Sequence, residues 1–176
     1  HRPDELGSRV RELGALEARG LREAVAQLQG FELPAAVWEN KVLVPRLADY
    51  DPQSLDHLFL SGDLVWGRLR PPQRDEASSQ AIAAMTRSMP ISLLLREDLS
   101  WLLSDQRPDL AAAASSRGQE VLAALRHKGA LFYQHLKSLT GLLPTQLEEA
   151  LRELAALGLV SSDTFAAVRA IDVGNK

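Results

Sequence analysis

Two short stretches of this sequence have the clearest pattern of β-strands, and they limit the possible fold more than any other feature. Leu64 and Trp66 alternate with their neighbours over residues 63–69, and a second apolar run covers residues 91–95. Elsewhere Gly and Pro divide the chain into segments with apolar residues at helical spacing. We therefore expect a mainly helical (α+β) fold with one short hairpin made by these two strands.

The segments before the hairpin have recognisable helix starts and stops. Four helices are expected there, over residues 3–19, 21–29, 35–40 and 52–60. Gly20 and Gly30 should end the first two, because glycine is a poor helix former. Asp51 before Pro52 has the form of an N-cap followed by proline at the first helical position. Helices followed by two strands give the element order of a winged-helix unit.

Composition divides the chain into four parts. Residues 1–19 form a leading helix, and residues 20–103 form a first winged-helix-like unit. The unit carries a long polar wing insertion at about residues 70–90, with a short helix at 81–87. Residues 104–116 are a polar linker, and residues 117–176 form a second winged-helix-like unit. The predicted fold is thus a tandem of two such units.

The second unit shows four more helical segments and one short strand. The helices are expected over residues 118–127, 130–139, 145–157 and 164–170, with a strand at Leu159 and Val160. Phe132, Leu136 and Leu139 are expected to lie on one apolar stripe.

Four motifs in register resemble those of the large helicase-related (Lhr) family of bacterial DNA-repair helicases. They are Leu33-Pro34-Ala35-Ala36-Val37-Trp38-Glu39-Asn40-Lys41-Val42-Leu43-Val44-Pro45-Arg46, Tyr50-Asp51-Pro52-Gln53-Ser54-Leu55-Asp56, Ser61-Gly62-Asp63-Leu64-Val65-Trp66 and Gly158-Leu159-Val160-Ser161-Ser162-Asp163-Thr164-Phe165. The resemblance implies an accessory module of an ATP-dependent 3′-to-5′ DNA helicase active in DNA repair. Its partners would be DNA, single-stranded or at a duplex junction, and the other domains of the helicase.

The motor of such a helicase, with its ATP and Mg²⁺, would lie outside this chain. No G-x-x-x-x-G-K-[ST] loop is present, and Asp75-Glu76-Ala77-Ser78 lacks the apolar strand of a helicase acidic box. His57, His127 and His135 do not have zinc-ligand spacing. We expect no cofactor or metal in this chain, which starts at His1 and reads as a piece of a longer polypeptide. Zero cysteines and no membrane-length apolar run indicate a soluble, cytoplasmic protein.

A net charge of −3 means that any contact with nucleic acid must come from a local patch. Residues 117–142 hold four basic residues and one acidic residue. The predicted contacts are Arg46, Trp66, Arg68, Arg70, Arg126, His127, Lys128 and Lys137. Trp66 has two interpretations, a platform for stacked bases or a core residue. The helix at 145–157 carries Glu148, Glu149 and Glu153, so it should pack on a neighbouring domain rather than read a groove.

Two other function classes stay open. Tandem winged helices also resemble bacterial alkylpurine DNA glycosylases, whose catalytic motif is Gln-x-Gln or Gln-x-Asp. Gln27 and Gln29 have that spacing; Phe31 does not continue it from Gln29, and Glu32 is one residue out of register. A polar group there could orient water for base excision. The third class is a module that only binds other proteins.

Overall fold

The computed structural model describes the backbone of residues 3–70, 88–103 and 110–173, and the side chains of residues 14–70, 88–103 and 110–169. Its helices are α1 (Pro3–Leu28), α2 (Pro52–Leu60), α3 (Leu99–Leu102), α4 (Ser116–Lys128), α5 (Tyr133–Thr140), α6 (Pro144–Ala156) and α7 (Ala166–Val173). Its strands are β1 (Leu33–Pro34), β2 (Leu64–Gly67) and β3 (Pro90–Leu95). The mainly helical fold predicted from the sequence is confirmed. The short helix predicted at residues 81–87 and the segment Asp75–Ser78 lie outside the described residues.

The sheet is antiparallel with strand order β1-β3-β2. Leu64 pairs with Leu95 and Gly67 with Ser92, so the predicted hairpin is confirmed. Strand β1 was not predicted, because two residues that include a proline show no alternation; Leu33 pairs with Ile91. Both strands of the hairpin are almost wholly buried, which places the sheet inside the core.

Helix α1 runs without a break through Gly20, so the predicted stop at this residue was wrong. A Cβ atom on Gly20 would lie 3.3 Å from Cδ2 of Leu47. Glycine costs a helix interior about 1 kcal/mol relative to alanine, and here its small size lets the Leu47 loop approach the helix. Packing therefore outweighs the local propensity of this residue.

The segment after β1 is also longer than predicted. A 3₁₀ turn at Ala35–Val37 leads into a π-helix at Trp38–Leu43 and a second 3₁₀ turn at Val44–Arg46. The wide i→i+5 turn brings Trp38, Val42 and Leu43 into the core together. Helix α2 starts as predicted, with the Asp51 side chain accepting the backbone N–H of Gln53 at 2.9 Å.

Two hydrophobic clusters hold the molecule together. The first joins α1, the sheet, α2 and the π-helix around large side chains such as Trp38, Phe59 and Ile91. The second joins α4, α5 and α6 around Val121, Leu147 and Leu154. In the predicted apolar stripe of α5 only Leu136 is buried, while Phe132 and Leu139 are exposed. That stripe is therefore not the core face of α5.

Helix α6 links the two clusters. Leu154 and Leu157 belong to the second cluster, whereas Ala155 and Ala156 belong to the first. Gly158 then takes a positive φ of 70°. The backbone N–H of Gly158 donates to Ala155 O at 3.0 Å, and that of Leu159 donates to Leu154 O at 2.9 Å. This is a Schellman ending, so the strand predicted at Leu159 and Val160 was wrong: the N–H of Leu159 closes the helix instead.

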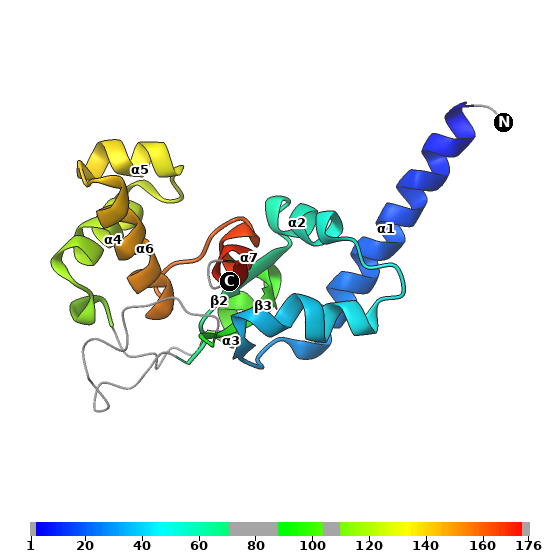
Figure 1. The fold of residues 1–176 in the computed structure, drawn as a ribbon, viewed down its shortest axis with the longest axis horizontal. Coiled ribbons are helices and arrows are strands. Elements are labelled where there is room, and N and C mark those ends of the chain that lie inside the picture. The colour runs from blue at the N-terminus through cyan, green and yellow to red at the C-terminus, as the bar shows by residue number, and fades with distance from the viewer. Residues whose placement is uncertain (1–2, 71–87, 104–109, 174–176) are drawn as a thin grey trace.

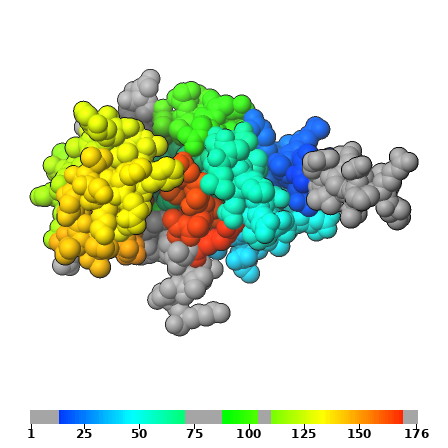
Figure 2. Space-filling model, turned by 90° about the horizontal axis from the view of Figure 1, so that it is seen from above, coloured from blue at the N-terminus to red at the C-terminus, as the bar shows by residue number. Residues whose placement is uncertain are grey.

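The chain returns to the first cluster at its end. Phe165 and Val168 are buried there, and α7 packs against the 3₁₀ turn Ala35–Val37. Figure 2 shows α7, in red, between the α4–α6 helices and the cyan segment that contains α2. Figure 1 shows α1 projecting from the side of the molecule that lies away from α4, α5 and α6. The division of the chain at residues 104–116 stays a prediction, but α7 contributes to the first core and not to the second.

Within the described residues no helix is both long and apolar enough to cross a membrane.

Candidate nucleic-acid interface

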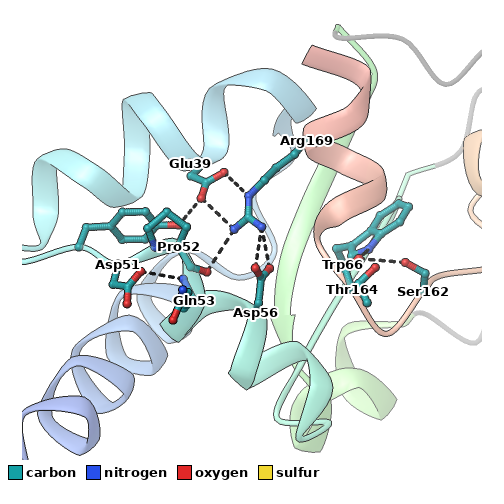
Figure 3. A network of polar contacts seen from close by, with 10 residues as sticks. Glu39, Asp51, Pro52, Gln53, Asp56, Trp66, Ser162, Thr164 and Arg169 are labelled. Carbon is teal, nitrogen blue, oxygen red and sulfur yellow. Dashed lines mark hydrogen bonds and ion pairs between the residues drawn. The ribbon is translucent and has the colours of Figure 1, made fainter. Parts of the chain in front are cut away.

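Trp66 was predicted either to stack bases or to lie in the core, and its surroundings favour the core. Its side chain is 2% exposed, and its indole N–H donates to the carbonyl of Thr164 at 3.0 Å. The Ser161 hydroxyl donates to the Trp66 carbonyl, and the Ser162 hydroxyl donates to Thr164 O at 2.9 Å. Figure 3 shows Trp66 held against this segment. No face of the indole is free to receive a base.

Arg68, at the end of β2, is also engaged inside the protein. One of its guanidinium nitrogens donates to the carbonyl of Ala156 at 3.0 Å, at the C-terminus of α6. A cation at this end of a helix is favourable, because the last carbonyls carry partial negative charge. Burial lowers the pKa of Arg68, and the charge of Glu32 opposes that effect. Arg68 thus joins the sheet to α6.

Two other predicted basic contacts remain at the surface. The side chain of Arg46 is exposed, and its guanidinium donates to the carbonyl of Val42 in the same turn, at 2.9 Å. Arg70 is exposed, and its backbone N–H donates to Glu32 at 3.0 Å. Among the described residues, neither Arg46 nor Arg70 contacts the basic residues at the end of α4.

The three residues considered for base excision lie around the end of α1. The Gln29 amide donates to Asp98 at 2.7 Å and accepts the backbone N–H of Leu95 at 3.2 Å. Glu32 accepts the backbone N–H of Leu69 at 2.6 Å. Gln27 is exposed. Two of the three side chains are therefore occupied in holding loops to the sheet, which leaves them poorly placed to orient water.

Among the residues that the structure describes, the guanidinium of Arg169 on α7 makes the most polar contacts, and sequence reasoning missed it. It bonds to Glu39 at 2.7 Å and to both oxygens of Asp56 at 2.7 and 2.8 Å. Tyr50 donates its hydroxyl hydrogen to Glu39 at 2.6 Å. We call Glu39, Tyr50, Asp56 and Arg169 the α7 latch. Figure 3 shows the guanidinium of Arg169 between Glu39 and Asp56.

The α7 latch is partly shielded from water, with the side chains of Arg169 and Asp56 29% and 35% exposed. The Glu39 side chain is 14% exposed, and the Arg169 guanidinium lies 5.5 Å from the centre of the Phe165 ring. Hydrogen bonds to Glu39 raise the pKa of Arg169, and burial raises the pKa of the Tyr50 hydroxyl. Glu39, Tyr50 and Asp56 lie within the four motifs, and this position was the sequence signal that could have identified them. Arg169 stands outside them, and nothing in the sequence marked it.

The basic end of α4 is different, because its charges are not used internally. Arg126, His127 and Lys128 form the last turn and are exposed, and Gly129 ends the helix with φ 80°. Lys137, on α5, is half-buried. Among the described residues, no carboxylate forms an ion pair with Arg126, Lys128 or Lys137. The sequence from residue 121 to residue 147 contains no Asp or Glu, so this surface attracts anions.

By contrast, the acidic residues of α6 face the other end of α4. Glu153 accepts from both the backbone N–H and the hydroxyl of Ser115, at 2.7 and 2.6 Å. Glu149 lies 3.7 Å from Arg117, and Glu148 lies 3.6 Å from Arg152. Helix α6 packs on α4 within the same hydrophobic cluster, and the predicted packing of its acidic face on a neighbouring domain stays a prediction.

Comparisons with known proteins agree with this architecture. Residues 6–87 match the family model for the winged-helix domain of large helicase-related protein. The "Lhr helicase/ probable uracil glycosylase" of Mycolicibacterium smegmatis is 29% identical over 154 residues, and the "Lhr helicase/uracil glycosylase" of Escherichia coli is 28% identical over 158 residues. Each alignment covers 86% of this chain but 9% of the relative, so the chain spans about a tenth of the length of these curated relatives.

The first helices and the small antiparallel sheet, together with the match over residues 6–87, indicate a winged-helix domain in the first part of the chain. The relationship to the Lhr family that the four motifs predicted is confirmed.

Proposed function

We propose that this chain is an accessory module of an Lhr-type helicase and that it contacts the DNA backbone through the basic end of α4. The observation that carries the proposal is the exposed turn Arg126-His127-Lys128, which no carboxylate of the described residues neutralises. Lysine and arginine at such a surface bind phosphates and release counterions. The names of both relatives contain "Lhr helicase", which supports the assignment to a helicase.

In this proposal the parent protein is an ATP-dependent helicase that acts in DNA repair. The module would guide single-stranded DNA, or DNA at a duplex junction, and would contact the other helicase domains. ATP and Mg²⁺ would be held by a motor outside this chain. This sequence has no loop suited to nucleotide phosphates, so no step of ATP hydrolysis is assigned to it.

A salt titration of DNA binding tests the proposal. Fluorescence anisotropy with a labelled single-stranded oligonucleotide should show weak binding that falls with salt. With about three phosphate contacts, log K should decrease with a slope of about −2 against log[salt]. The double variant Arg126→Ala, Lys128→Ala should reduce the slope by about 1 to 2 and weaken binding at every sequence tested.

The matched control is Arg152→Ala, because Arg152 is also an exposed helical arginine but is paired with Glu148. The Arg152→Ala variant should bind the oligonucleotide with the same affinity as the unchanged chain. Binding that ignores salt, or that is lost equally in the control, would contradict the backbone contact and favour a module that only docks on protein.

Base excision is the competing function, since the names of the two relatives also include a uracil glycosylase. Incubating this chain with oligonucleotides that contain uracil or alkylated bases, followed by alkali, tests it directly. We expect no strand scission, because Gln29 and Glu32 already hold backbone N–H groups. Scission that disappears in Gln29→Ala would establish the enzyme instead.

A further inference from the structure

Three exposed apolar side chains lie in α5 or directly before α5 and α6. Phe132 is 80% exposed, Leu139 54% and Leu143 62%. All three lie in the stretch from residue 121 to residue 147 that contains no acidic residue. An exposed aromatic ring within a basic surface is the combination that single-strand-binding proteins use, with phosphates on the cations and bases on the ring.

Phe132 lies in the short connection between the basic end of α4 and the start of α5. Phe132 directly precedes α5 and follows Lys128 by four residues, and α4 packs against α5. The ring makes an edge contact with His135, with centroids 6.0 Å apart and an angle of 68°. The hydroxyl of Tyr133 donates to Pro144 O at 3.3 Å, which joins the start of α5 to the start of α6 beside Leu143. Figure 2 shows α5, in yellow, at the molecular surface.

Each of the two other exposed aromatic residues has a carboxylate as a near neighbour, which Phe132 lacks in the sequence. Phe31 is 64% exposed and is followed by Glu32, while Trp101 is 66% exposed and hydrogen bonds to Asp98. Carboxylates at these places repel phosphates. Charge therefore distinguishes Phe132 from the other exposed rings and selects a polyanion as its partner.

We propose that Phe132 stacks on a base of single-stranded DNA whose phosphates contact Arg126 and Lys128. This inference rests on the proposed backbone contact and adds the group that recognises unpaired bases. A duplex keeps its bases stacked on one another, so the ring has no base face to occupy there. The site thus prefers single strands over duplex, a preference that the basic residues alone do not supply.

The test compares a 15-nucleotide oligothymidylate with an oligonucleotide of equal length made of abasic spacers. Phe132→Ala should weaken binding of the oligothymidylate about 5- to 10-fold, the lower end of what one stacked base contributes. It should leave binding of the abasic strand unchanged. Phe132→Trp should keep the affinity for the oligothymidylate within about twofold, because stacking on indole is equally good.

Phe31→Ala is the matched control, because it also removes an exposed phenyl ring, but one that lies next to Glu32. It should leave the affinities for the oligothymidylate and for the abasic strand unchanged. Circular dichroism checks that each variant is folded. If the unchanged chain binds both strands equally and Phe132→Ala alters neither, stacking is wrong while the backbone contact stands. If the unchanged chain binds neither strand, the proposed function fails and the stacking inference fails with it.

Discussion

The sheet region and the α4–α6 region use their charged and aromatic residues in opposite ways. In the sheet region, Trp66, Arg68, Glu39 and Asp56 are all bonded to other parts of the protein. In the α4–α6 region, Arg126, Lys128 and Phe132 are exposed. The motif residues Trp66, Glu39 and Asp56 therefore connect parts of the protein to one another. The surface suited to a ligand, at residues 126–132, lies outside the four motifs.

The largest effect is expected from breaking the α7 latch. Arg169→Met keeps the length of the side chain but leaves the carboxylates of Glu39 and Asp56 facing each other without their cation. Loss of one partner of a shielded ion pair is costly, and partial exposure moderates it, so we expect a loss of about 2 kcal/mol in the free energy of unfolding. Urea denaturation measures this.

Arg152→Ala is the comparison for that experiment, because its pair with Glu148 is exposed on both sides. Its cost should be below about 0.5 kcal/mol. Equal losses in the two variants would mean that the α7 latch is no stronger than an ordinary surface pair, and the contrast between the regions would weaken.

A smaller effect is expected at the joint between the sheet and α6. Arg68→Met removes the hydrogen bond to Ala156 O and should cost about 1 kcal/mol of stability. DNA affinity should change by less than about twofold, because Arg68 is turned to the protein. Lys128→Ala should show the reverse, with stability retained and affinity reduced. A loss of affinity in Arg68→Met as large as in Lys128→Ala would place Arg68 at the DNA.

The smallest effect concerns acid stability at the end of α1. The hydrogen bond from Gln29, with one from Trp101, holds the pKa of Asp98 below its usual value. Such a carboxylate stabilises the fold above its unfolded-state pKa, and the contribution disappears as pH falls through the folded-state pKa. Asp98→Asn should therefore lower the urea midpoint at pH 7 and make its decline below about pH 4 shallower. An unchanged acid profile would remove Asp98 from this account.

Local chemistry explains which elements were predictable. The Asp51-Pro52 pair marks the start of α2, and the short apolar run Leu64-Val65-Trp66 marks β2, because both signals need only neighbouring residues. Gly20 failed as a helix stop because the deciding contact, with Leu47, comes from a distant segment. Strand β1 is likewise defined by its pairing with β3 and not by its own sequence.

The candidate site was predictable in part for the same reason. The basic run Arg126-His127-Lys128 is legible without any tertiary structure. Whether Trp66 and Arg68 face solvent depends on Thr164 and Ala156, almost a hundred residues away. Phe132 was assigned to an apolar stripe by helical spacing, but α5 begins only at Tyr133, and the ring lies just outside the helix.

Because α7 returns to the first core, the limits of the family match differ from the limits of the packed core. Residues 6–87 match the winged-helix family model, yet β2 needs β3 as its partner, and Phe59 stacks on Phe165 at 5.5 Å. A shortened protein that stops at residue 87 would leave the Trp38 indole without the carbonyl of Ile91 and would uncover Phe59. The first core is therefore built from both ends of the described chain, and helices α4 and α5 lie between these parts in sequence without contributing to that core.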